Sequence, residues 1–158
     1  KGVKYALEAI ESLMIKYPDL KVNMFGIPER PEGLNAKVHY VQSATPNQVC
    51  DLYNNSAIAL CASLQEGFGL TGMESMACGC ALVTTNTGGV NDYAKDGETA
   101  VFVETKNAKD IEDKIAYLFE HNDERICLAK RGHENIVHNF SFEKSAQKLE
   151  QILLNLCT

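Results

Sequence analysis

Residues 57–85, AIALCASLQEGFGLTGMESMACGCALVTT, decide the fold. The stretch begins with a continuous apolar run at 57–62 and ends with a second one at 81–84. Runs of this length are typical of strands that are buried on both faces of a parallel sheet. Between them lie a glycine-rich loop and a segment of helical character. A strand, a helix and a second strand with short connections form the unit from which doubly wound α/β domains are built.

The rest of the chain continues this alternation of helices and strands. Apolar residues at helical spacing predict a helix over residues 3–17, which Pro18 ends. Thr45 and Pro46 fit the N-cap and the first residue of a second helix, which extends to Tyr53. Further strands are expected at 22–26, 37–41 and 100–103, and further helices at 108–119, 123–138 and 142–156. We therefore expect one doubly wound, Rossmann-like domain, residues 1–158, with a mostly parallel sheet.

Composition and charge exclude several classes of protein. A chain of 158 residues with 45% hydrophobic content is long enough for one compact domain with a core. The net charge of −6 and the absence of Lys or Arg runs disfavour nucleic acid as a partner. The apolar stretches are too short for a transmembrane segment, and the start lacks the pattern of a signal peptide. We expect a cytoplasmic protein.

Six cysteines raise the question of disulfides or a metal site. Cys50, Cys61 and Cys127 lie in apolar helix or strand patterns, so we expect buried free thiols there. Cys78 and Cys80 form a C-x-C pair without a second pair at zinc-ligand spacing, and the four histidines are scattered. We expect no metal.

The glycine-rich loop has the character of an anion site. Gly67, Gly69 and Gly72 let the backbone approach a ligand, and amides at a helix N-terminus favour negative charge. The string is formally G-x-G-x-x-G, the fingerprint of dinucleotide-binding domains, which expects an acidic residue about twenty positions later. Residues 84–86, Thr-Thr-Asn, stand there instead. An NAD-type domain is therefore the less favoured alternative.

Two carboxylates flank the loop. Beside a phosphate, Glu66 and Glu74 are unfavourable unless they accept hydrogen bonds from hydroxyl groups, and carboxylates suit the paired hydroxyls of sugars. This pattern favours a nucleotide-sugar, with a glutamate at each sugar and the diphosphate between them. Structural roles stay open: Thr71 and Glu74 have the spacing of a capping box, and Glu66 could be a solvated loop residue.

The chain resembles the carboxyl-terminal half of a family 4 glycosyltransferase of the GT-B fold, the glycosyl transferases group 1. The first group of motifs is Ser63-x-x-Glu66-Gly-Phe-Gly-Leu-x-x-x-Glu74-x-Met-Ala-x-Gly79, Val83-Thr-x-x-x-Gly88-Gly89 and Asp96-Gly97. Further similarity is found at Lys1-Gly2, Tyr53-Asn-Asn-Ser-Ala and Phe140-Ser-Phe142. The resemblance therefore covers nearly the whole chain.

This resemblance implies retaining transfer of a sugar from a nucleotide-diphosphate-sugar, without a metal or other cofactor. It implies that Glu66 contacts the transferred sugar and that Lys1 pairs with the diphosphate, as the two catalytic residues. The implied donor sugar and diphosphate site consists of Lys1, Glu66, Gly67, Phe68, Gly69, Leu70 and Thr71. Glu74 would bind the ribose, and the base would lie against Val41, Gln42 and Ser43.

The resemblance also implies two parts that the sequence lacks. The family pattern has a central strand upstream of Lys1, ending in Gly-Arg, and an amino-terminal half that binds a glycan or lipid acceptor. We therefore expect a fragment of a two-domain enzyme of polysaccharide biosynthesis, inactive alone. The full-length enzyme would be cytoplasmic, with peripheral membrane association left open. A non-catalytic subunit that binds nucleotide-sugars is the alternative from another class.

Overall fold

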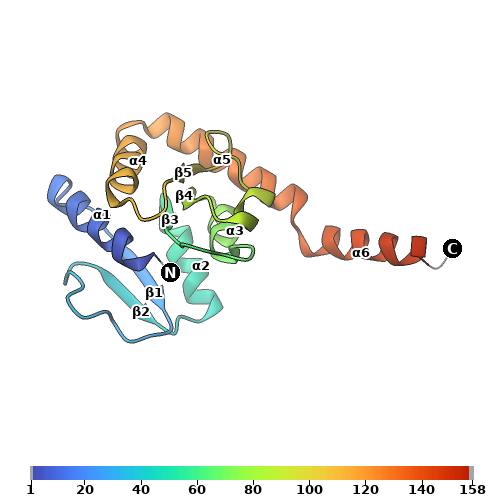
Figure 1. Ribbon diagram of the computed structural model, residues 1–158, viewed down its shortest axis with the longest axis horizontal. Coiled ribbons are helices and arrows are strands. Elements are labelled where there is room, and N and C mark those ends of the chain that lie inside the picture. The colour runs from blue at the N-terminus through green and yellow to red at the C-terminus, as the bar shows by residue number, and fades with distance from the viewer. Residues whose placement is uncertain (1, 157–158) are drawn as a thin grey trace.

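The computed structural model describes residues 2–156, so that Lys1, Cys157 and Thr158 lie outside the described residues. Helices and strands alternate along most of the chain (Figure 1). The order is α1 (Val3–Lys16), β1 (Asn23–Gly26), β2 (His39–Gln42), α2 (Pro46–Asn54), β3 (Ile58–Cys61), α3 (Leu70–Ala77), β4 (Ala81–Thr85), the 3₁₀ helix η1 (Gly88–Asp92), β5 (Val101–Val103), α4 (Ala108–Glu120), α5 (Asn122–Asn139) and α6 (Phe142–Leu156).

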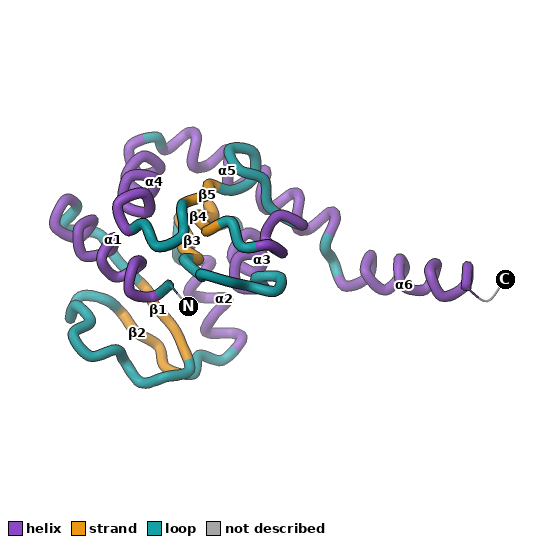
Figure 2. Tube along the Cα trace, viewed as in Figure 1, coloured by secondary structure: helices purple, strands orange, loops and turns teal. Residues whose placement is uncertain are grey.

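Every strand pairing is parallel, which confirms the α/β class. The strands form a sheet of β1 and β2 and a second sheet in the order β3-β4-β5. Figure 2 shows β1 and β2 apart from the other three strands. Within residues 2–156, no strand pairs with the second edge of β1 or of β3. The expected central strand upstream of Lys1 stays a prediction.

Helices cover both faces of the three-stranded sheet. β4 is buried along its whole length, and its side chains alternate between two cores. Ala81 and Val83 pack in the core that α1 and α4 cover, whereas Leu82 packs in the core that α2, α3 and part of α5 cover. This arrangement is that of a doubly wound domain, in which ligands bind beyond the carboxyl ends of the strands.

Local sequence signals account for several element boundaries. Thr45 is the N-cap of α2, accepts a hydrogen bond from the Gln48 amide and forms a capping box with that residue, while Pro46 is the first helical residue. Asn107 caps α4 in the same manner by accepting from the Asp110 amide. The cap at Thr45 is confirmed.

The burial expected for the cysteines is partly wrong. Cys50 and Cys127 are exposed and Cys61 is half-buried. In α2 and α5 the residues that face the core are Tyr53 and Leu128, so that the cysteines lie beside the apolar stripe and not on it. A thiol next to an apolar helix position is therefore poor evidence of burial.

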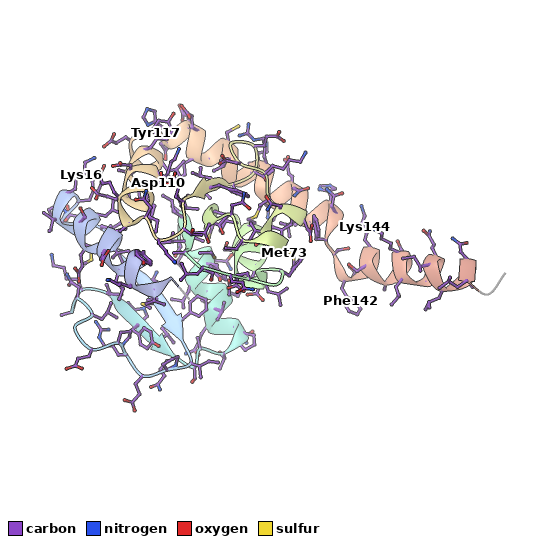
Figure 3. The ribbon with its side chains drawn as sticks, viewed as in Figure 1. Lys16, Met73, Asp110, Tyr117, Phe142 and Lys144 are labelled. Atoms are coloured by element: carbon purple, nitrogen blue, oxygen red, sulfur yellow. The ribbon has the colours of Figure 1, made fainter. Side chains whose placement is uncertain are left out.

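α6 extends away from the rest of the domain (Figure 1). None of its residues is buried, and Phe142 is 84% exposed. Figure 3 shows Phe142 and Lys144 at the start of this helix with their side chains directed outward. Leu149, Leu153 and Leu156 continue an exposed apolar stripe along it. The helix thus has an apolar face that the described residues leave uncovered.

Candidate functional site

Glu66 lies in the loop that follows β3, and its carboxylate is held by a neighbour. The Ser63 hydroxyl donates a hydrogen bond of 2.6 Å to Glu66 Oε1. Thr85, the buried last residue of β4, donates in turn to the backbone carbonyl of Ser63 and, at 3.5 Å, to that of Cys61. The half-buried Glu66 is therefore anchored to the ends of two strands, and it is not a freely solvated loop residue.

The glycine turn is built against a buried tyrosine. Gly69 has φ +83°, in the left-handed region that favours glycine, and it is the N-cap of α3. The Tyr93 hydroxyl donates to the Gly69 carbonyl at 2.8 Å, and the Phe68 ring lies 5.3 Å from the Tyr93 ring. A Cβ at Gly72 would stand only 2.5 Å from the Tyr93 hydroxyl. These contacts explain two of the three glycines in the turn.

A second glycine loop packs directly on the turn. Gly89 lies in η1, after β4, and a Cβ there would overlap the Gly67 carbonyl and stand 2.6 Å from the Phe68 Cα. Gly88 beside it has φ +62°. Gly89 of the sequence motif therefore permits a backbone-to-backbone contact that a larger residue would block, whereas Gly88 has a backbone conformation that favours glycine.

The turn presents free amides at a helix N-terminus. None of the amides of residues 67–71 donates a hydrogen bond to another described residue. Leu70 and Thr71 form the first turn of α3, and both are exposed. Unpaired amides and the helix dipole together favour an anion such as a diphosphate.

Glu74 has no part in capping α3. The helix begins after Gly69, without a side-chain cap, so that Thr71 is already inside the helix. The capping-box alternative for Thr71 and Glu74 is therefore wrong, because the left-handed glycine starts the helix two residues before the threonine. Glu74 is exposed in the second turn of α3, which leaves its carboxylate available to a ligand.

Both carboxylates lie around the carboxyl end of β3. Cys61 is the last residue of that strand, and burial raises the pKa of its thiol. The negative charges of Glu66 and Glu74 raise this pKa further, so each carboxylate is close enough to act on the same sulfur. The structure thus gathers the two glutamates and the glycine turn at one strand end.

The start of α1 meets the same strand end. Gly2 is buried, and a Cβ there would overlap the carbonyl of Ala62, the residue after β3. Lys1, which the resemblance assigns to catalysis and to the diphosphate, lies outside the described residues. Its role stays a prediction, although the residue that follows it touches the candidate site.

The expected base-binding residues lie at the carboxyl end of β2. Val41 and Gln42 end β2, and Ser43 follows with φ 49° and donates its amide to Gly26 at 2.7 Å. No hydrogen bond or ring contact joins these three residues to residues 63–74 within the described chain. The structure brings the glutamates and the glycine turn together but does not join the base region to them.

Two contacts link the small sheet to the glycine turn indirectly. The Phe25 ring of β1 lies 5.8 Å from the Tyr53 ring of α2. The Tyr53 hydroxyl donates to the Thr71 carbonyl in α3 at 3.1 Å. The site is also supported by Tyr53, Thr85 and Tyr93. Local sequence patterns do not indicate this role, because the contacts of these side chains bridge residues that are 18 to 24 positions apart.

Two pockets of residues 2–156, of about 540 and 920 Å³, lie elsewhere on the domain, and neither is lined by any of residues 63–74. The described residues hold no group of three or more His, Cys, Asp or Glu side chains that could bind a metal ion. None of their helices combines the length and the apolar character that a membrane crossing requires.

The fold is that of the carboxyl-terminal domain of a GT-B glycosyltransferase. The carboxyl-terminal domain of a group 1 family glycosyl transferase from Francisella tularensis is 27% identical, with a TM-score of 0.80 over 90% of this chain and 80% of that one. A HepE structure from Anabaena in complex with UDP-glucose is 16% identical, with a TM-score of 0.84 over 98% of this chain and 45% of that one. At that identity the second likeness shows the fold alone.

Residues 1–135 match the family model of the glycosyl transferases group 1, and the chain belongs to this family. A D-inositol 3-phosphate glycosyltransferase from Corynebacterium urealyticum is 25% identical over all of this chain. The chain spans only 41% of the length of that relative.

Proposed function

We propose that this chain is the donor-binding domain of a retaining, family 4 glycosyltransferase. Joined to an amino-terminal acceptor-binding domain, it would transfer a sugar from a nucleotide-diphosphate-sugar to a glycan or lipid acceptor. The observation that carries the proposal is the arrangement of Glu66 and Glu74 on either side of free amides at the carboxyl end of β3.

Each part of the donor has a matching group in this arrangement. The diphosphate binds the amides of residues 67–71, and Lys1 adds a positive charge. Glu66 accepts hydrogen bonds from the transferred sugar, and Glu74 accepts them from the ribose hydroxyls. The base lies toward the surface of Val41, Gln42 and Ser43. The hydroxyl groups at both ends of the donor thus donate hydrogen bonds to the two carboxylates, which offsets their repulsion by the phosphate groups between them.

The proposed chemistry depends on stabilisation of the leaving group. When the bond between the sugar and the diphosphate breaks, negative charge grows on the diphosphate oxygens. Amides that are already oriented by the Gly69 turn stabilise that charge without reorganisation. The proposal requires neither a metal ion nor a covalent nucleophile on this chain.

The acceptor half of the enzyme belongs to the same proposal. A second domain would close over a donor that is bound at the glutamates and the glycine turn. The exposed apolar face of α6 offers that domain a surface to pack against. The isolated chain would then be inactive, and the whole enzyme would act on cytoplasmic donor in polysaccharide biosynthesis.

The test is calorimetry on the full-length protein with UDP-glucose, and with GDP- and dTDP-linked sugars. We expect one of these donors to bind. Glu74→Gln should weaken binding by about ten- to a hundredfold, because a hydrogen bond to a charged group contributes about 1.5–3 kcal/mol. Its melting temperature should stay unchanged, since Glu74 does not cap α3.

Glu134→Gln, at an exposed position of α5, is the matched control and should change neither quantity. Absence of binding to every donor would contradict the proposal. So would a Glu74→Gln variant with lowered melting temperature and unchanged affinity. Donor hydrolysis or transfer to an acceptor distinguishes an enzyme from a non-catalytic nucleotide-sugar-binding subunit, which would bind without turnover.

A further inference from the structure

Two free thiols meet on the side of the domain away from the glycine turn. Cys50 is exposed in α2, and Cys78 is the half-buried C-cap of α3. Burial raises the pKa of the Cys78 thiol, and an interaction with the Cys50 side chain raises it further. Asn54, one turn after Cys50, donates its side-chain amide to the Cys50 sulfur at 3.4 Å. Side chains of two different helices thus converge on one point.

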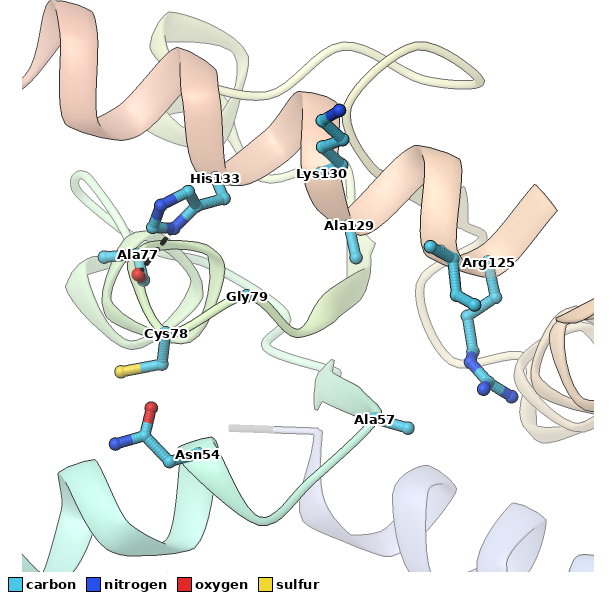
Figure 4. Close-up of a pocket in the computed structure, with 10 residues that line it drawn as sticks. Asn54, Ala57, Ala77, Cys78, Gly79, Arg125, Ala129, Lys130 and His133 are labelled. Atoms are coloured by element: carbon cyan, nitrogen blue, oxygen red, sulfur yellow. Dashed lines mark hydrogen bonds between the residues drawn. The ribbon is translucent and has the colours of Figure 1, made fainter. Parts of the chain in front are cut away.

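A pocket gives small molecules access to this point. Its volume is about 540 Å³, and Asn54, Cys78 and Gly79 line it together with residues of α5. Figure 4 shows the Cys78 sulfur directed toward the Asn54 amide across the opening between α2 and α3. A diffusible oxidant can therefore reach the sulfur pair.

Contacts on both sides hold the two helices at this separation. The Tyr53 hydroxyl binds the Thr71 carbonyl at 3.1 Å. The Cys80 thiol donates to the carbonyls of Tyr53 and Ser56, at 3.2 and 3.3 Å. Because α2 is tied to both ends of α3, these contacts fix the positions of the two cysteines relative to each other.

We propose that Cys50 and Cys78 form a reversible disulfide when the protein meets a peroxide. The Cys50 thiol loses its proton, and its sulfur attacks one peroxide oxygen. The O–O bond breaks, the departing hydroxide takes up that proton and leaves as water, and Cys50 becomes a sulfenic acid. The Cys78 thiol then attacks that sulfur, its proton and the hydroxyl leave as a second water, and the S–S bond forms. Two thiols and one hydrogen peroxide thus give one disulfide and two waters. An excess of a small thiol reverses the reaction by exchange.

The other described cysteines are poor competitors for this reaction. Cys80 is buried, and burial raises the pKa of its thiol to about 11. Cys61 is likewise raised in pKa by burial. Cys127 is an exposed free thiol in a different helix, α5. Burial also raises the pKa of Cys78, so Cys50 is the first to react and Cys78 resolves.

The disulfide would act on the donor site through α3, and this second step rests on the proposed function. Cys78 ends the helix whose first turns carry the free amides and Glu74. A covalent S–S bond is shorter than a thiol contact, so it draws the end of α3 toward α2. The amides at the other end of the helix shift with it. We expect weaker donor binding in the oxidised protein.

The experiment treats the full-length protein with hydrogen peroxide, alkylates the remaining thiols and maps the peptides without reduction. Residues 38–94 contain no Lys or Arg, so cleavage at glutamate is needed. Cleavage at Glu32, Glu66, Glu74 and Glu98 places Cys50 and Cys78 in two peptides, residues 33–66 and 75–98. We expect these peptides to be linked, with the mass lower by two hydrogens, and to separate after dithiothreitol.

Substitutions of single cysteines identify the two sulfurs that form the disulfide. Cys50→Ser and Cys78→Ser should each abolish it, and Cys127→Ser should leave it intact. Complete alkylation of both peptides in the oxidised wild type would overturn the proposal. A link that persists in Cys78→Ser would overturn it too, because Cys80 would then be the partner.

Calorimetry with UDP-glucose on the oxidised and reduced forms tests the effect on the site. Weaker binding by the oxidised wild type, with no change in Cys50→Ser, is expected. Equal affinity of the linked and reduced forms would overturn the regulatory step. Absence of binding in both forms would count against the proposed function, whereas the peptide link is measured independently of any donor.

Discussion

Glu66 shows how a loop carboxylate acquires a defined position. Its hydrogen bond from Ser63 is 2.6 Å long, and the carbonyl of Ser63 accepts in turn from Thr85 at the end of β4. The position of the carboxylate is therefore set by two strands and not by the loop alone. A group that is held in this way loses little conformational entropy when it binds a sugar, which favours a role in the site.

The contact of Gly89 with the turn gives a test at a single residue. A methyl group at Gly89 would overlap the Gly67 carbonyl and crowd the Phe68 Cα at 2.6 Å. Gly89→Ala should therefore lower the free energy of unfolding by about 1–3 kcal/mol. Denaturant titration of the full-length protein measures this change.

Gly67→Ala is the matched control for stability. A Cβ at Gly67 meets no atom within 4 Å, and its φ is not in the left-handed region. This variant should unfold at nearly the same denaturant concentration as the wild type. Equal stability of Gly89→Ala and Gly67→Ala would show that the two glycine loops do not pack as described.

At the scale of elements, α1 and α4 are joined by an ion pair with a definite pH dependence. Lys16 and the Tyr17 hydroxyl donate to the Glu120 carboxylate at 2.9 and 2.7 Å. These bonds, the one from Lys16 first, lower the pKa of Glu120 from its ordinary value of 4.5. A lowered pKa stabilises the fold at pH values above 4.5, and this contribution is lost as the pH falls through the folded-state pKa.

Glu120→Gln should therefore lower the melting temperature slightly at about pH 7, where the carboxylate is ionised. The difference from the wild type should shrink as the pH is lowered below 4.5. Thermal unfolding as a function of pH measures it, with Glu11→Gln as the control on the exposed face of α1. A difference that does not change with pH would contradict the contact.

Hydrophobic periodicity predicts most of the helices and strands. The buried strands at 57–62 and 81–84 and the helix that Thr45 caps are predicted and found, since each signal is local. η1 was not predicted, because residues 88–92 carry no periodic pattern. The misplaced cap at Thr71 has another cause. The left-handed conformation of Gly69 depends on its contact with Tyr93, which lies 24 residues away.

The candidate site was predictable to the extent that its residues are neighbours in the sequence. Glu66, the glycine turn and Glu74 belong to one stretch of the sequence, and the structure gathers them at one strand end. Supporting residues such as Thr85 and Tyr93 come from other loops, so that only the folded chain assigns them. The roles of these residues toward a donor stay predictions.

At the scale of the whole molecule, the sheets within residues 2–156 leave one edge of β1 and one edge of β3 unpaired, each opposite the edge that pairs with β2 or β4. The carbonyls of Val22, just before β1, and of Gly26, its last residue, accept from the amides of His39 and Ser43, so both face β2. Asn23 and Phe25 then face the opposite edge, because direction alternates along a strand. In the same way, the bond from the Ala81 amide to Ala57 directs Ile58 and Leu60 of β3 away from β4.

If a central strand upstream of Lys1 pairs with these edges of β1 and β3, the outward-facing amides of both strands become hydrogen-bonded in the full-length protein. Hydrogen exchange resolved by residue measures the effect. The amides of Asn23, Phe25, Ile58 and Leu60 should exchange as slowly as those that face β2 and β4. Fast exchange of the four, beside slow exchange of their neighbours, would contradict a single continuous sheet.

A crystal structure of the full-length protein with UDP-glucose would show where the donor binds. We predict diphosphate oxygens within hydrogen-bonding distance of the amides of residues 67–71, ribose hydroxyls on Glu74 and glucose hydroxyls on Glu66. A nucleotide-sugar bound elsewhere, for example in the pocket beside Asn54 and Cys78, with the N-terminus of α3 vacant, would contradict the account.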